Sequence, residues 1–165
     1  MPADARAGTR TRLFALSHQP MTGPIMTEPH DPNIPAATLA PPGGHYSHSV
    51  RWGDMVFVSG QLGVRPDGTH TADLPFEDQV RQALANLLAA VRSSGLDRAD
   101  LLKVTAYIVD VANWPRFNAI YAEVMGSARP ARAVVPVPEL HYGYLVEIDA
   151  IAARGGPEPS GRASA

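Results

Sequence analysis

The 165-residue sequence contains no cysteine. This absence excludes a disulfide framework, a thiolate nucleophile and any zinc site built from cysteine. It agrees with a reducing compartment, and a cytoplasmic location is the default expectation.

Long apolar runs are also missing, since no stretch approaches the roughly 18 residues that a helix needs to span a bilayer. The apolar patch at residues 13–16 is too short for the core of a signal peptide. Neither sign of charge dominates, because the formal net charge is -2 and the basic residues form no cluster or stripe. We therefore expect neither a membrane nor a nucleic acid as a partner.

The chain divides into three parts by composition. Residues 1–42 carry half of the sixteen prolines without a period of 2 or 3.6, which predicts a disordered or loosely ordered N-terminal arm. Residues 154–165 are rich in Gly, Pro and Ser and are expected to form a flexible tail. One domain is predicted over residues 43–153, which is long enough to bury a core.

The first half of this domain predicts two strands and a helix. Strands are expected at residues 47–51 and 54–62, around a turn at Trp52-Gly53. Residues 75–94 predict a helix, because Pro75 suits a first turn, Gly95 suits the position after the last turn, and apolar residues recur at spacings of three and four. These apolar residues are Phe76, Val80, Ala83, Leu84, Leu87, Leu88 and Val91.

The second half predicts one strand, one helix and two more strands. Residues 103–111 form a β-branched run, and Asn113 with Pro115 begins a helix that ends at Gly126. Two further strands carry Arg132 and Glu147. The order β-β-α-β-α-β-β predicts an α+β fold with a single sheet and both helices on one face.

The last strand presents two different faces. Val146, Ile148 and the alternate residues after them suit a helix-covered core, whereas Leu145, Glu147 and their alternates are mixed apolar and acidic. Since no third helix is available to cover the second set, we expect this face to pack on another copy of the chain.

Arg132 and Glu147 are the two charges that the pattern singles out. Both have apolar neighbours within strands, where a charge is costly unless it is paired or faces a group that needs it. A guanidinium offers a rigid fork for a carboxylate, and a glutamate can act as a general base. The structural alternative is an ion pair from Arg132 to Glu147 or Asp149 that braces adjacent strands.

Several fragments of the domain together resemble the reactive intermediate deaminase family, also called the RidA or YjgF family. The fragments are Tyr46 and residues 56–61, 79–87, 117–121, 130–132 and 146–152. The resemblance implies a chorismate-mutase-like fold and a homotrimer with a central barrel and a site in each cleft between subunits. It also implies hydrolysis of 2-enamine or 2-imine acids to 2-keto acids and ammonia, without metal or cofactor.

The resemblance assigns roles to six residues. The substrate-binding arginine corresponds to Arg132 and the water-positioning glutamate to Glu147, and these two are the expected catalytic residues. Further substrate contacts are expected from Tyr46, Ser59 with Gly60, and Asn118.

Each of the further contacts has a plainer explanation. Tyr46 can be an interface aromatic, a β-bulge explains Gly60, and Asn118 can cap a loop. Residues 140–143, Leu-His-Tyr-Gly, replace a Leu-Pro-Lys that is common in the family. This change at the rim leaves open which acid is the substrate.

Three kinds of function follow from these residues. The first is a deaminase resembling the 2-iminobutanoate/2-iminopropanoate enzymes, or a pathway-specific deaminase acting on an aminomuconate-like acid. The second is a non-catalytic trimer that binds a keto acid and regulates a partner. The third is a nuclease, which the acidic balance of the chain disfavours. His45 and His48 lack a third ligand at metal-binding spacing, so no metal is expected.

Overall fold

The computed structural model describes residues 39–155. The predicted N-terminal arm lies outside these residues except for its last four positions, and all but two residues of the predicted tail also lie outside them.

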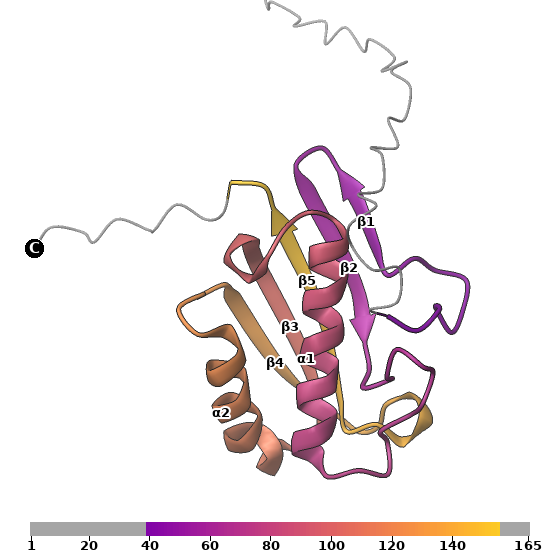
Figure 1. The fold of residues 1–165 in the computed structure, drawn as a ribbon. Helices are drawn as coiled ribbons and strands as arrows, with labels where there is room; N and C mark the ends of the chain where they lie inside the picture. Colours follow the sequence, from indigo (N-terminus) through magenta and orange to yellow (C-terminus); the bar gives the residue numbers. More distant parts are fainter. Residues whose placement is uncertain (1–38, 156–165) are drawn as a thin grey trace, which may run out of the picture. The chain divides into compact units, whose positions relative to one another are not determined.

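The described part of the chain folds around one mixed sheet (Figure 1). Its strands lie in the order β1-β2-β5-β3-β4, and only the β3–β4 pair is parallel. The strands are β1 (Ser49–Trp52), β2 (Met55–Gln61), β3 (Leu101–Val109), β4 (Ala131–Val137) and β5 (Val146–Ala153). The predicted element order is therefore confirmed, and strand ends differ from the predicted ones by up to two residues.

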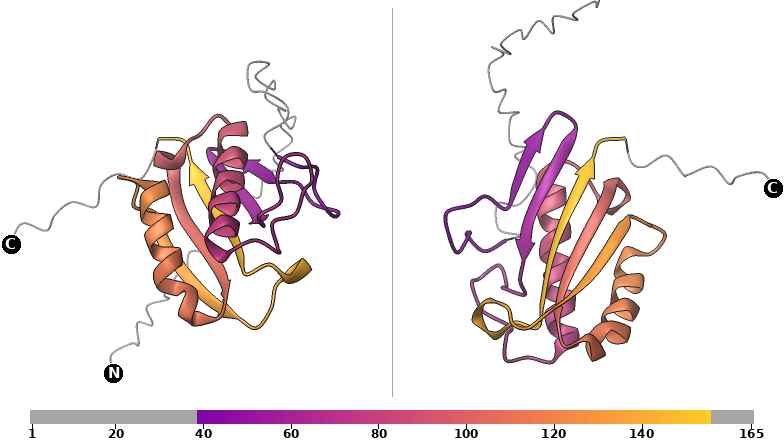
Figure 2. Two further views of the ribbon diagram at one scale, coloured as in Figure 1. Left: turned by 60° about the horizontal axis from the view of Figure 1, so that its bottom comes forward. Right: turned by 180° about the vertical axis from the view of Figure 1, so that it is seen from behind.

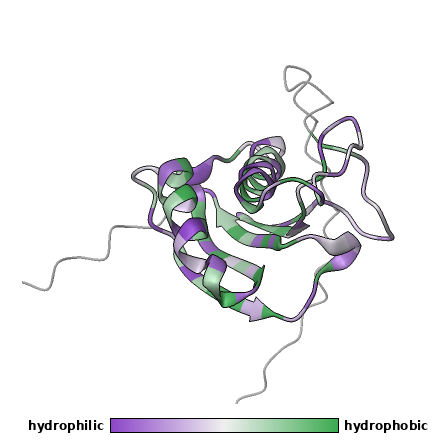
Figure 3. Ribbon diagram, turned by 90° about the horizontal axis from the view of Figure 1, so that it is seen from below, coloured by the Kyte–Doolittle hydropathy of each residue, from purple (hydrophilic) through white to green (hydrophobic). Residues whose placement is uncertain are grey.

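Two helices, α1 (Phe76–Ser93) and α2 (Trp114–Met125), cover one face of the sheet (Figure 3). Pro75 precedes α1 as its N-cap, and Pro115 lies in the first turn of α2, where a missing N–H removes no helical bond. Gly126 ends α2 at φ 60°, a conformation that glycine adopts without a Cβ penalty. The prediction of both helices on one face is confirmed.

Strand β5 shows how the core is built. Its residues alternate between fully covered and partly exposed, with Val146 and Ile148 at 0% exposure under the helices. The other face of the sheet carries no helix in the described part of the chain (Figure 2). This pattern agrees with the predicted division of β5 into a core set and a set on the open face.

Strand β3 lies between β4 and β5. Arg132 on β4 is paired in register with Val104, and Glu147 on β5 is paired with Tyr107. The alternative of an ion pair bracing adjacent strands is therefore wrong, because the strands that carry Arg132 and Glu147 are not neighbours.

Candidate functional site

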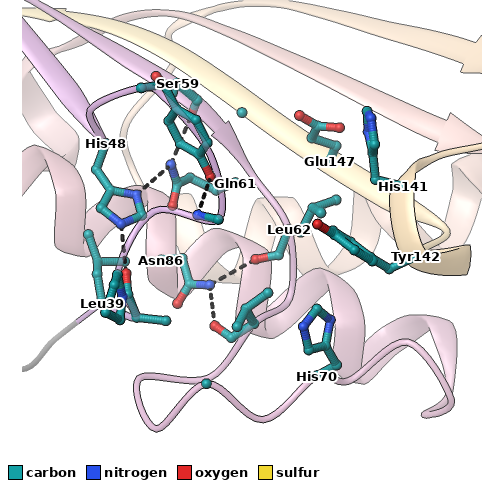
Figure 4. Close-up of a pocket in the computed structure, with 17 residues that line it drawn as sticks. Leu39, His48, Ser59, Gln61, Leu62, His70, Asn86, His141, Tyr142 and Glu147 are labelled. Carbon is teal, nitrogen blue, oxygen red and sulfur yellow. Dashed lines mark hydrogen bonds between the residues drawn. The ribbon is translucent and has the colours of Figure 1, made fainter.

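A pocket of about 540 Å³ opens where β2 ends (Figure 4). Segments distant in sequence line it: residues before β1, the loop after β2, helix α1, the 3₁₀ turn η3 (His141–Gly143) and the start of β5. The lining includes Tyr46, Ser59, Gly60, His70, Tyr142 and Glu147. Four of the six predicted site residues thus meet at this pocket.

Gly60 is the residue that makes room for the Glu147 carboxylate. A Cβ at Gly60 would lie 1.9 Å from Glu147 Oε1 and 2.9 Å from its Cδ. The register of β2 against β5 shifts between Val58 and Gln61, so a β-bulge lies at the same place. The bulge and the close approach therefore both occur, and the group that approaches is the Glu147 carboxylate.

Glu147 is half-buried on the wall of the pocket. Burial raises the pKa of its carboxyl, and the neighbouring Asp149 charge raises it further, whereas His141 lowers it. Asp149 accepts a hydrogen bond from the Tyr107 hydroxyl at 3.1 Å, so its carboxylate has a structural partner. A carboxyl with a raised pKa is a better proton acceptor once it is ionised, which suits a general base.

Arg132 lies elsewhere in the same chain. Its Nη2 donates to Asn118 Oδ1 at 2.8 Å, and its guanidinium carbon lies 4.5 Å from the ring centroid of Tyr121. Both partners belong to α2, so the guanidinium lies on the helix-covered side of the sheet, at the outer strand β4. Among residues 39–155 it has no acidic partner.

One chain therefore does not bring the two predicted catalytic residues together. Arg132 is paired with Val104, which is buried beneath the helices, so Arg132 lies on the helix-covered face. Glu147 alternates with the buried residues of β5 and therefore lies on the opposite face of the sheet. Asn118 goes with Arg132 and lies outside the pocket of Glu147. Asn118 does not cap a loop, the alternative considered above, because its amide oxygen accepts a hydrogen bond from the Arg132 guanidinium.

Tyr46 and Ser59 occupy the side of the pocket nearest β1. Tyr46 is 49% exposed, and its hydroxyl accepts a hydrogen bond from the Gly43 N–H at 3.3 Å. The Ser59 hydroxyl donates to the Ser47 carbonyl at 2.7 Å, which ties β2 to the segment that carries Tyr46. Tyr46 therefore presents a ring to the pocket, while Ser59 holds that segment in place.

The pocket also contains residues that the pattern did not assign to it. His70, His141 and Tyr142 form one wall, and Asn86 lies at the base with its amide donating to the carbonyls of Leu62 and Val64. The departure at residues 140–143 was the available signal for His141 and Tyr142. His70 follows a turn with no motif, so nothing in the sequence marked it.

Residues 39–155 contain neither a metal-binding cluster nor a membrane-spanning helix. No three His, Asp or Glu side chains gather there closely enough to hold a metal ion. None of the helices in that range is both long and apolar enough to cross a membrane.

The family model described as Endoribonuclease L-PSP matches residues 37–154. A RutC family protein of Pyrococcus horikoshii is 36% identical over 111 residues, which are 67% of this chain and 88% of that protein. A protein of Dermatophagoides farinae named 2-iminobutanoate/2-iminopropanoate deaminase is 36% identical over 119 residues, covering 72% of this chain and 93% of that protein.

Solved structures agree with these sequence matches. E. coli TdcF with bound serine superposes with a TM-score of 0.68 at 32% identity, over 72% of this chain and 95% of that one. The YjgF gene product from E. coli also has a TM-score of 0.68 at 32% identity, over 73% of this chain and 97% of that one.

Proposed function

This chain belongs to the Endoribonuclease L-PSP family, which is the RidA/YjgF family, and we propose that it is a hydrolytic deaminase of reactive 2-enamine and 2-imine acids. The observation that carries the proposal is the Glu147 carboxylate, half-buried in a pocket beside a glycine that alone leaves space for it. The products would be a 2-keto acid and ammonia.

Glu147 acts as the proton acceptor in the proposed reaction. Its carboxylate takes a proton from a water molecule as the water oxygen bonds to the imino carbon. That proton passes to the nitrogen as the C=N double bond becomes single, which gives a carbinolamine. The carbinolamine hydroxyl then loses its proton, which reaches the nitrogen through the same carboxylate. The carbonyl forms as the C–N bond breaks, and ammonia leaves. A positioned base contributes about 10²–10⁴-fold, which is a sufficient contribution for substrates that already hydrolyse in water.

Arg132 binds the substrate carboxylate through the two N–H groups of its fork. Asn118 and the Tyr121 ring hold the guanidinium in one orientation, so little side-chain entropy is lost when the acid binds. The absence of an acidic partner among residues 39–155 leaves the charge available to a ligand.

Because Arg132 and Glu147 face opposite sides of the sheet, the working site requires two copies of the chain. Arg132 lies on the outer strand β4, where a second copy can reach it, and the open face of the sheet carries partly exposed apolar residues such as Phe57 and Val135. We propose a homotrimer in which the Arg132 of one copy meets the pocket of the next.

Two similar proteins support this reading. A relative with 36% identity bears the name of an imine deaminase, and the TdcF structure holds serine, an amino acid of the size of the proposed substrates. The family name also mentions an endoribonuclease. The lining of the Glu147 pocket contains no Lys or Arg, so it offers no run of cations for an RNA backbone, whereas a single carboxylate needs only the Arg132 of a second copy.

Subunit mixing tests the shared site. Arg132→Ala and Glu147→Gln should each abolish ammonia release from 2-iminopropanoate generated in situ. When the two inactive variants are denatured and refolded together, about one quarter of the interface sites should regain both native residues, and activity should return in proportion.

Each variant refolded alone is the control for this mixture. Mixed assemblies that stay inactive, although mass spectrometry shows that the subunits exchanged, would contradict a site built from two copies. Full activity in either single variant would contradict the assigned roles.

A non-catalytic keto acid sensor is the second candidate, and the serine bound in TdcF is the observation that favours it. Glu147→Gln separates the two candidates. In an enzyme, the variant binds ligand but loses the turnover that the wild type shows. In a sensor, the variant still binds ligand and still transmits its signal.

A further inference from the structure

One wall of the pocket takes no part in the proposed chemistry. It consists of three aromatic rings that follow one another away from Glu147: His141, Tyr142 and His70 (Figure 4). The ring centroids of His141 and Tyr142 are 6.2 Å apart, and those of Tyr142 and His70 are 5.1 Å apart. A substrate whose imino carbon lies at Glu147 has this wall available for its side chain.

Buried partners orient the His70 ring. The Thr71 N–H donates to the Tyr144 hydroxyl oxygen at 3.1 Å, so the hydroxyl hydrogen is free to point at His70 Nδ1, 3.2 Å away. Thr71 and Tyr144 are 2% and 1% exposed, so water is excluded from the bond between them, whereas the His70 ring itself is exposed. The Tyr144 hydroxyl hydrogen has no other acceptor among residues 39–155, which favours Nδ1 as the acceptor and Nε2 as the donor.

Tyr142 is held in an unusual backbone conformation. Its φ is 60°, in the left-handed region that non-glycine residues seldom adopt, and Gly143 follows at φ 75°. The turn keeps the Tyr142 side chain over the pocket, with its hydroxyl directed toward the middle (Figure 4). Within residues 39–155 neither this hydroxyl nor the His141 ring makes a side-chain hydrogen bond.

The wall therefore offers hydrogen-bond donors that have no acceptor among the described residues. The His70 Nε2–H and the Tyr142 O–H are these donors, and the pocket lining holds no Lys or Arg. Tyr142 is 67% exposed and His70 is also exposed, so water can pair with these donors in the free protein. A ligand side chain that displaces this water binds better when it supplies an acceptor than when it leaves the donors unpaired.

We propose that His70, Tyr142 and His141 form a side-chain subsite that selects 2-imino acids whose side chain ends in an oxygen acceptor, a carboxylate or a carbonyl. The subsite rests on the proposed function, because it takes the far end of a substrate whose reacting carbon lies at Glu147. It makes short apolar imines such as 2-iminopropanoate accepted but poorer substrates.

Stable keto acid products are suitable probes. Calorimetric titration of the full-length protein in its native assembly would compare 2-oxoglutarate, its 5-methyl ester and 2-oxohexanoate, which have similar length and differ in the terminal group. We expect 2-oxoglutarate to bind about tenfold more tightly than 2-oxohexanoate, as one hydrogen bond to a charged acceptor provides. The ester tests a neutral carbonyl, and tighter binding than 2-oxohexanoate shows that charge is not required.

Two variants connect this preference to the wall. Tyr142→Phe removes only a hydroxyl, and His70→Phe keeps a ring that can pack on Tyr142. Each should reduce the ratio of the two affinities by about three- to tenfold while the melting temperature confirms a folded protein. The affinity for 2-oxohexanoate should change far less than that for 2-oxoglutarate.

The outcomes separate the subsite from the proposed function. Equal binding of 2-oxoglutarate and 2-oxohexanoate, or a preference that survives both substitutions, overturns the subsite, whereas Glu147-dependent turnover of 2-iminopropanoate would still support the deaminase. A wild-type protein that neither binds keto acids nor turns over 2-iminopropanoate would overturn both the subsite and the proposed deaminase function.

Discussion

Replacing Gly60 by alanine tests whether the position of the Glu147 carboxylate determines activity. The added Cβ would lie 1.9 Å from Oε1, 2.9 Å from Cδ and 3.2 Å from Cγ of Glu147, so the carboxyl group has to move by more than 1 Å. Gly60 is not among the glycines at positive φ, so alanine itself fits the backbone. The cost should therefore fall on the carboxylate.

The expected effect is large on catalysis and small on stability. The end of a glutamate side chain can swing toward the open pocket, so the free energy of unfolding should change by about 1 kcal/mol or less. A displacement of about 1 Å from a productive geometry costs about 10²-fold in rate, on the order of 2.7 kcal/mol of transition-state stabilisation. Ammonia release from 2-iminopropanoate, with thermal melts in parallel, measures both quantities.

A matched control is available in the same pocket. Gly43 also lines it, has no positive φ and has no atom within 4 Å of a hypothetical Cβ, so Gly43→Ala should leave the rate nearly unchanged. In a double-mutant cycle, Gly60→Ala should cost little in a Glu147→Ala background, because the side chain that it displaces is gone. Full activity in the Gly60→Ala variant would refute the reasoning.

Three further predictions concern the charged groups. Glu147→Gln should eliminate turnover but leave keto acid affinity within a fewfold of wild type, measured by calorimetry; lost binding would mean that the carboxylate also holds the ligand. Because burial raises the Glu147 pKa, the acidic limb of kcat/KM against pH should have its midpoint above the ordinary glutamate value of 4.5. Any activity that Glu147→Gln retains should lack this limb. Asn118→Ala should raise KM about tenfold through a looser Arg132, less than Arg132→Ala does, and an unchanged KM would contradict the positioning role.

The same raised pKa has a consequence for stability. A carboxyl whose pKa is higher in the folded state binds more protons there than in the unfolded chain. Its contribution therefore favours folding at low pH and is lost as the pH rises through the folded pKa. The Glu147→Gln variant should gain stability relative to wild type at neutral pH but not near pH 4, and chemical denaturation at the two pH values measures this. A gain of equal size at both would contradict the assignment.

Much of the fold was determined by short-range patterns. The period of three and four over α1, the alternation in β5 and the prolines at both helix starts depend on local geometry, so they predicted element type and which face is buried. The position of Arg132 and Glu147 within apolar strands singled them out, and the resemblance then assigned their roles. These predictions required no knowledge of which strands are neighbours.

The sheet order and the contents of the pocket depended on tertiary structure. Residues far apart in sequence become neighbours only when strands pair, so no local pattern indicated that β3 separates β4 from β5 and places Arg132 and Glu147 on opposite faces. In the same way, His70 joins Tyr142 through contacts across more than seventy residues. Side-chain periodicity encodes burial along one element, whereas a site is made by the packing of several, and only the packed chain specifies it.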